Sequence, residues 1–261
     1  MLQKLLYFRK LRSKLIFALK ADYYDELEFS IPVGNDYWAQ LVEPDAFDSF
    51  SEIFIHKEYL DLLPKDTPLK VIDLGSHYGY FSLWLQSMYP KSEIRSLLVE
   101  PSSKCHKSLS MLTAHKKING RFVHLAKGIG NPREGSIELF ERPFMSSSKE
   151  QNEDGEISRT VPIVQVEEII ENLEPPYDLI KCDVEGAEWE FLEFYDDIVR
   201  SCKTILLEWH SWHGGDGDYP QIESRLQDLG FIIKKKTHPV EAVGRTGEVG
   251  LLQAVNQSKL S

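Results

Sequence analysis

The feature that most constrains the fold is an alternation of short apolar runs with helix-like stretches, which begins at residue 69. Buried strands are expected at residues 69–74, 94–99, 121–126, 178–183 and 204–209, and helices at 79–89, 102–117, 187–200 and 219–229. Residues 231–235 and 249–255 are expected to close the sheet as an antiparallel pair. Strands that alternate with helices predict parallel pairing with right-handed crossovers. The sequence therefore predicts a doubly wound α/β fold with a seven-stranded, mostly parallel sheet.

A less regular stretch interrupts this alternation between the third and fourth strands. Residues 136–141 are predicted to form an extra strand, residues 161–166 an extended segment and residues 167–172 a short helix. Residues 145–160 are polar, and we expect them to form a mobile loop.

Charge and cysteine content limit the function classes. The 261 residues carry 30 basic and 41 acidic side chains, a net charge of −11, which disfavours a protein that grips nucleic acid. Three cysteines without a C-x-x-C pair favour a reduced, cytoplasmic compartment. No apolar run reaches the roughly 18 residues of a membrane-spanning helix.

The chain is expected to divide into four segments. Residues 1–20 carry six basic side chains and no acid, and they predict a basic amphipathic helix. This helical extension would dock on the acidic domain, or make a peripheral contact with a membrane or a partner through residues 2–20. Residues 21–68 form a cap, residues 69–256 the α/β domain and residues 257–261 a tail. The sequence does not predict the oligomeric state.

The first strand ends in a glycine turn, Asp73-Leu74-Gly75-Ser76-His77-Tyr78-Gly79. Ligands of parallel sheets bind at the carboxyl ends of the strands, and glycine lets them approach the backbone. The dinucleotide pattern G-x-G-x-x-G is absent. The pattern D-x-G-x-x-x-G instead suits S-adenosylmethionine, with Asp73 near the ammonium and Gly75, Ser76 and Gly79 in the turn. His77 either lines this turn or serves as a base.

The next two strand ends extend the expected cofactor site. Glu100 ends the second strand, 21 residues after Gly79, where a carboxylate can accept hydrogen bonds from both hydroxyls of a ribose. Gly128 follows the third strand and is expected at the adenine edge.

Acids and a histidine follow the fourth and fifth strands. Asp183 and Glu185 would face the methyl acceptor, and Glu208 and His210 would reach the same rim. Such groups can act as a general base, hold a substrate amine or ligate a divalent cation. If these residues have no part in the chemistry, Asp183 caps the following helix and Glu188 is a surface acid. We expect no metal; a bound one would use Asp183, Glu208 and His210.

Several of these stretches resemble the FkbM-type methyltransferases. The similar segments are residues 54–59, 71–82, 98–101, 161–167 and, most specifically, 180–188 (IKCDVEGAE). The resemblance implies a Rossmann-like class I methyltransferase that uses S-adenosylmethionine and commonly methylates a sugar or polyketide hydroxyl. It also implies that Asp73, Gly75, Gly79 and Glu100 touch the cofactor.

The leading hypothesis is an S-adenosylmethionine-dependent O-methyltransferase that acts on a sugar or another small metabolite. Asp183, with Glu185 or His210, would take the acceptor proton. The alternatives are a protein or nucleic-acid acceptor, or a non-catalytic scaffold that binds the cofactor. A nicotinamide oxidoreductase is disfavoured because the third glycine and a Tyr-x-x-x-Lys pair are missing.

Overall fold

The computed structural model describes residues 29–34, 36–43, 45–141, 146–147, 157–211, 218–241 and 247–259. The expected basic helix at residues 1–20 and residues 148–156 of the expected loop lie outside the described residues. Within the described part of the chain, no helix is long and apolar enough to cross a membrane.

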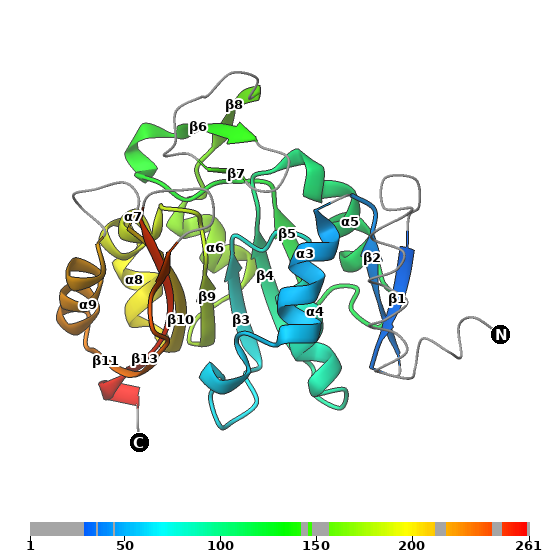
Figure 1. Cartoon of the computed structure of the whole chain (residues 1–261), viewed down its shortest axis with the longest axis horizontal. Helices are drawn as coiled ribbons and strands as arrows, with labels where there is room; N and C mark the ends of the chain where they lie inside the picture. Colours follow the sequence, from blue (N-terminus) through cyan, green and yellow to red (C-terminus); the bar gives the residue numbers. More distant parts are fainter. Residues whose placement is uncertain are drawn as a thin grey trace.

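The centre of the fold is a sheet with strand order β11-β13-β10-β9-β3-β4-β5, and β12 pairs with β13 (Figure 1). The strands are β3 (Lys70–Leu74), β4 (Arg95–Val99), β5 (Phe122–Leu125), β9 (Tyr177–Cys182), β10 (Cys202–His210), β11 (Phe231–Lys236), β12 (Val240–Glu241) and β13 (Glu248–Asn256). The neighbours from β5 to β10 pair in parallel. Strand β13 is antiparallel to both β10 and β11. The predicted seven-stranded, mostly parallel sheet with an antiparallel closing pair is therefore confirmed.

Helices cover both faces of this sheet (Figure 1). They are α4 (Tyr80–Met88) and α5 (His106–Thr113) on one face, and α6 (Val166–Asn172), α7 (Glu188–Phe194), α8 (Asp196–Arg200) and α9 (Tyr219–Asp228) on the other. Successive strand residues point to opposite faces, so Leu179 packs with α4 and α5 while Ile180 packs with α6 to α9. Burial on both faces explains why these strands read as continuous apolar runs.

The helix predicted over residues 187–200 is wrong in one respect, because it is divided at Tyr195 into α7 and α8. The buried Tyr195 hydroxyl donates a hydrogen bond to the carbonyl oxygen of Val164, at 2.8 Å. This tertiary contact fixes the side chain at the break. The helix predicted over residues 102–117 is also shorter, since it begins as a 3₁₀ turn, η3 (Ser103–Cys105), and α5 ends at Thr113.

The cap contains regular elements that its sequence pattern did not reveal. Strands β1 (Phe29–Val33) and β2 (Tyr37–Leu41) pair in an antiparallel hairpin. Helix α3 (Ala46–Phe50) continues into the π-helix η1 (Ser51–His56), and a 3₁₀ turn, η2 (Leu60–Leu62), follows. The apolar side chains of these elements share one core cluster with α4 and α5. The cap therefore packs directly on one face of the sheet.

A second, three-stranded sheet lies beyond the carboxyl ends of the central strands, at the top of Figure 1. Strand β6 (Ser136–Glu141) lies between β7 (Ser146–Ser147) and β8 (Ile157–Pro162). The strand predicted at 136–141 is thus confirmed. The loop predicted at 145–160 is wrong at both ends, where the chain pairs with β6. Leu139 and Val161, both buried, give the pair an apolar side.

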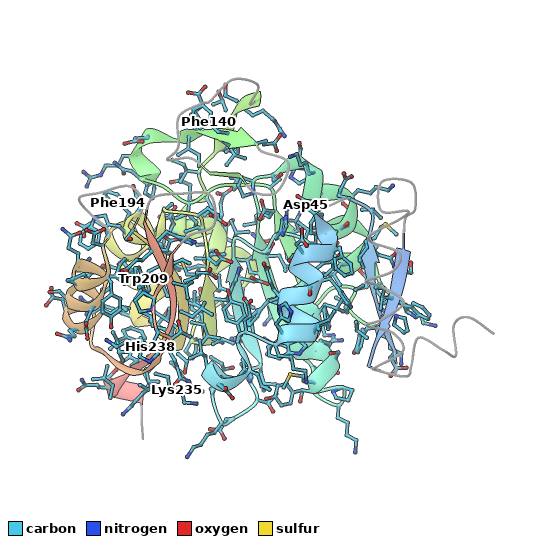
Figure 2. All side chains as sticks on the ribbon, viewed as in Figure 1. Asp45, Phe140, Phe194, Trp209, Lys235 and His238 are labelled. Carbon is cyan, nitrogen blue, oxygen red and sulfur yellow. The ribbon has the colours of Figure 1, made fainter. Side chains whose placement is uncertain are left out.

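Trp209 is a buried residue of β10 (Figure 2). Its ring lies against Gly250 of β13, where an added Cβ would come within 2.8 Å of the indole, and 5.2 Å from the ring of Tyr219. Glu208 and His210, on either side of it in the strand, point to the opposite face. Trp209 therefore belongs to the core.

A substitution in the core should lower stability much more than one at an exposed position. We expect Ile180→Ala, at a fully buried position of β9, to lower the free energy of unfolding by about 2–5 kcal/mol, because it leaves a cavity in a packed core. Leu69→Ala, at a side chain that is 48% exposed, should change it by about 0.5 kcal/mol or less. Urea unfolding of both variants measures the difference, and equal losses would contradict the described core.

Candidate active site

A cavity of about 410 Å³ opens at the carboxyl ends of β3, β4, β9 and β10. Its lining includes most of the residues predicted from the strand ends: Gly75, Ser76, His77, Glu100, Gly128, Asp183, Glu185, Glu208 and His210. These residues meet because the carboxyl ends of parallel strands lie along one edge of a sheet.

The glycine turn after β3 has the shape of a ligand cradle. Gly75 has a φ of +65°, and an added Cβ would lie 1.7 Å from the carbonyl oxygen of Asp183, so only glycine fits. Gly79 has a φ of +74° and packs against Leu112. The buried Ser76 hydroxyl lines the cavity and has no hydrogen-bond partner among the described residues. The turn thus offers close backbone approach and one unused polar atom to a ligand.

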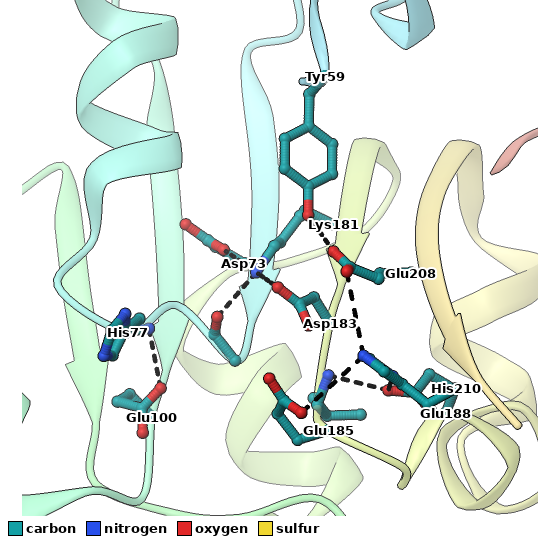
Figure 3. A network of polar contacts seen from close by, with 12 residues as sticks. Tyr59, Asp73, His77, Glu100, Lys181, Asp183, Glu185, Glu188, Glu208 and His210 are labelled. Carbon is teal, nitrogen blue, oxygen red and sulfur yellow. Dashed lines mark hydrogen bonds and ion pairs between the residues drawn. The ribbon is translucent and has the colours of Figure 1, made fainter. Parts of the chain in front are cut away.

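Glu100 is held rigidly at the end of β4 (Figure 3). Its two carboxylate oxygens accept hydrogen bonds from the backbone N–H groups of His77 and Ser102, each at 2.8 Å. A carboxylate oxygen has more than one acceptor position, so Glu100 can still accept from the hydroxyls of a ribose. The ribose contact of Glu100 stays a prediction.

Asp73 departs from its expected position, because it is fully buried and is not among the residues that line the cavity. One carboxylate oxygen accepts a hydrogen bond from the Ser82 hydroxyl at 2.7 Å, and the other lies 4.0 Å from Lys181 Nζ. Burial raises the pKa of Asp73 to about 6. Its place inside β3 puts the side chain beneath the turn, so direct contact with the methionine ammonium is not supported.

Gly128 lines the cavity beside an apolar wall formed by Ile129, Ile137 and Leu139. An added Cβ at Gly128 would lie 2.5 Å from Ile137 Cδ1, so the glycine lets strand β6 approach closely. The small sheet therefore closes this end of the cavity with aliphatic side chains, which suit the flat face of an adenine.

Asp183 is an ionised carboxylate that lines the cavity. Its Oδ2 lies 3.0 Å from the ammonium of the buried Lys181. Burial alone would raise the pKa of Asp183, but Lys181 and then His210 outweigh it and hold this pKa below its usual range. At neutral pH, Asp183 is therefore able to accept a proton.

His210 is surrounded by carboxylates on both sides of its ring (Figure 3). Its Nδ1 lies 3.0 Å from Glu188 Oε1, and its Nε2 lies 3.9 Å from Glu185 and 4.0 Å from Glu208. Burial opposes the charged imidazole, but these carboxylates, led by Glu188, raise the pKa of His210 to about 10. The ring holds its proton at neutral pH, so the geometry favours Asp183 over His210 as the base.

Glu188 is not the surface acid that its position at a helix start suggests, since only 2% of the residue is exposed. Its Oε1 accepts hydrogen bonds from the backbone N–H groups of Val184 and Gly186, each at 3.1 Å, as well as facing His210. It therefore holds the loop after β9 and orients the imidazole.

Three side chains could hold a cation. Asp183, Glu185 and His210 each present a ligand atom, and these atoms lie within 4.8 Å of one another. The metal ligands expected from the sequence were Asp183, Glu208 and His210, so the structure has Glu185 in the place of Glu208. The Oε2 of Glu208 instead accepts a hydrogen bond from the Tyr59 hydroxyl at 3.1 Å. Burial and Asp183 raise the pKa of Glu208 well above its usual range.

The cap supplies a wall of the cavity that the strand-end argument missed. The wall includes Asp45, Asp48, Glu52, Ile53, Glu58 and Tyr59. The π-helix ends at His56, and the next residue, Lys57, has a left-handed φ of +59°. This bend lies between Glu52 and Glu58, both of which face the cavity. In the sequence, residues 54–59 were the only sign that this segment belongs to the site, because they resemble a family motif.

Comparison with known proteins identifies the family to which the chain belongs. A family model described as the methyltransferase FkbM domain matches residues 73–233. The chain belongs to the FkbM methyltransferase family. It is 26% identical over 241 residues to methyltransferase sdnD of Sordaria araneosa, covering 75% of this chain and 90% of that protein. It is also 26% identical over 208 residues to methyltransferase 1 of Beauveria bassiana, covering 70% of this chain and 79% of the relative.

A solved structure supports the same fold. The methyltransferase FkbM of Methylobacillus flagellatus KT superposes with a TM-score of 0.51 at 15% identity, over 80% of this chain and 50% of that chain. Membership of the family makes S-adenosylmethionine the cofactor and methyl transfer the activity. The turn fits this group, because it has the cradle at Gly75 and the unused Ser76 hydroxyl.

The glycine at position 75 should be essential for cofactor binding. We expect Gly75→Ala to abolish measurable binding of S-adenosylhomocysteine, since the methyl group would clash with the carbonyl oxygen of Asp183. Gly120→Ala is the matched control, because Gly120 also has a positive φ, +77°, but no atom lies within 4 Å of an added Cβ. Calorimetric titration of both variants checks this; retained binding by Gly75→Ala would contradict the described contact.

Glu52 should make stability depend on pH. Partial burial, together with Glu58 and Asp183, raises the pKa of Glu52 from 4.5 to about 7. Its stabilising contribution is therefore fully present below pH 4.5 and is lost as the pH rises through about 7. Exposure of Glu52 to the cavity water reduces the size of the effect.

We therefore expect Glu52→Gln to match the wild-type Tm at pH 4.5 and to exceed it by about 2 °C at pH 8. Thermal unfolding at the two pH values measures the difference. Glu171→Gln, at an exposed position of α6 outside the cavity, serves as the control and should show no such pH-dependent gain. A gain for Glu52→Gln that is the same at both pH values would contradict the assignment.

Proposed function

We propose that this methyltransferase methylates a hydroxyl group of a small, polyhydroxylated metabolite such as a sugar. The observation that carries the proposal is the ionised Asp183, which stands in the cavity between the glycine turn and the cap wall. An ionised carboxylate at this place suits an acceptor that must lose a proton as it gains a methyl group.

The cofactor-binding half of the cavity would be formed by the turn, Glu100 and the apolar wall next to Gly128. Ser76 and the backbone of the turn would meet the amino-acid end, Glu100 would accept from the ribose hydroxyls, and Ile129 with Ile137 would flank the adenine. S-adenosylmethionine supplies an activated methyl group, so the protein has to provide alignment and a proton acceptor.

In the proposed reaction, Asp183 orients the acceptor hydroxyl and receives its proton while the new carbon–oxygen bond forms. The second product is S-adenosylhomocysteine, so atoms and charge balance. Lys181 and the protonated His210 keep Asp183 ionised until the proton moves. Glu188 fixes the imidazole from the far side of its ring.

The cap wall favours a neutral acceptor rich in hydroxyl groups. Glu52, Glu58 and Glu208 line the acceptor half of the cavity, and carboxylates accept hydrogen bonds from hydroxyls. The ionised Asp183 would repel phosphate and carboxylate groups, which disfavours phosphorylated acceptors and nucleic acid.

The test begins with calorimetric titration of S-adenosylmethionine. We expect Glu100→Ala to weaken binding at least about tenfold, because charge-assisted hydrogen bonds are lost. We expect Asp183→Asn to keep cofactor affinity within about threefold and to lower methyl transfer about 10²- to 10⁴-fold, the usual contribution of a general base. Transfer of a labelled methyl group to a panel of sugars and hydroxylated metabolites measures the activity.

Three results would reject the proposal. If Asp183→Asn turns over like the wild type, Asp183 is not the base. If the protein binds S-adenosylmethionine but labels proteins or nucleic acids rather than any small hydroxylated compound, the acceptor class is wrong. Cofactor binding without product on any acceptor would indicate a non-catalytic scaffold.

A further inference from the structure

We propose that Lys181 is a positioning residue that locks the glycine turn after β3 to the Asp183 loop after β9, and that this lock sets the affinity for the cofactor. The inference rests on the proposed function, because it assumes that the turn holds S-adenosylmethionine. The sequence patterns suggested no role for Lys181 itself.

Lys181 is a buried lysine with only 5% of its surface exposed, one residue before the end of β9. Its Nζ donates a hydrogen bond to the carbonyl oxygen of Gly75 at 2.8 Å and lies 3.0 Å from Asp183 Oδ2 (Figure 3). Asp73 Oδ1, on the neighbouring strand, lies 4.0 Å away. A single ammonium group therefore connects the turn, the loop after β9 and the interior of β3.

These contacts fix the turn from two sides. On the side of β4, the backbone N–H groups of Gly75 and Ser76 both donate to the carbonyl oxygen of Val99, at 3.0 and 3.1 Å. On the side of β9, Gly75 meets the carbonyl oxygen of Asp183 and the ammonium of Lys181. A turn that is already ordered binds its ligand more tightly, because binding does not have to order it.

The lysine has the chemistry that this position requires. The Gly75 carbonyl, the buried Asp73 and the partly buried Asp183 all need a donor or a positive charge, and an ammonium group offers three N–H donors from one point. Burying that charge is favourable only because these partners surround it. Lys181 therefore holds the carbonyl oxygen and the carboxylate in one relative position at the wall of the cavity.

A second lysine on the adjoining strand offers a matched control. Lys203, near the start of β10, pairs with Asp178 Oδ1 at 2.7 Å. Lys203 and Asp178 lie at the opposite end of the strands and are not among the residues that line the cavity. Lys203→Met thus also removes an ion pair, but not one that touches the turn.

The experiment measures the dissociation constant of S-adenosylhomocysteine by calorimetry. We expect Lys181→Met to raise this Kd at least about tenfold, Lys181→Arg to raise it less because the charge is kept, and Lys203→Met to change it by less than about twofold. A merely structural lysine would lower the Tm and the number of competent binding sites, but leave the Kd of the folded molecules unchanged.

Lys181→Met alone leaves the buried Asp73 and the partly buried Asp183 without their shared cation and can prevent folding. The double variant Lys181→Met/Asp183→Asn removes the pair together, and we expect it to bind at least about tenfold more weakly than Asp183→Asn. An unchanged Kd in folded Lys181→Met, or an equal Kd for the double variant and Asp183→Asn, overturns the inference. A wild-type protein that does not bind S-adenosylhomocysteine overturns the proposed function instead.

Discussion

The close contact between Gly75 and the carbonyl oxygen of Asp183 is the constraint on which the site depends. No side chain fits between them, and the Asp183 N–H also donates to the carbonyl oxygen of Leu74 at 3.2 Å. The cofactor turn and the proposed base are therefore parts of one main-chain unit. Their relative position is set by the backbone, which is the kind of alignment that a displacement reaction needs.

The acidic side chains crowded in this region destabilise the protein when no cofactor is bound. Glu52, Glu58, Asp183, Glu185 and Glu208 face a cavity whose lining also includes the cations Lys104, Lys127, Lys181 and His210. Burial raises the pKa values of Glu52 and Glu208, and repulsion from nearby acids, Asp183 among them, raises both further. A cofactor that carries a positive sulfonium would relieve part of this repulsion. Local conflict of this kind is common where a fold carries a function.

The sequence predicted the site best where the position of a residue depends only on the strand or turn that contains it. Apolar runs that end in glycine or acid located the rim holding Gly75, Glu100 and Asp183, because parallel strands align their ends. The sequence did not show whether an acid at a strand end faces the ligand or lies beneath the turn. Asp73 is the example, because both faces of β3 are buried and the sequence pattern is the same for either direction. Tyr59 and the other residues of the cap wall lie in elements without clear periodicity. They reach the cavity only through tertiary packing, which no local pattern records.

The cap also ties distant parts of the chain together. Tyr59 contacts Glu208, 149 residues later, and the Gln253 side chain donates to the carbonyl oxygen of Leu62 at 2.7 Å across 191 residues. Contacts of such long sequence separation slow folding, because the entropy of closing a long loop is lost before they form. During synthesis the glycine turn can therefore be assembled well before β13 emerges and inserts between β10 and β11. The two halves of the site would be completed at different times, with the acceptor wall the last to be secured.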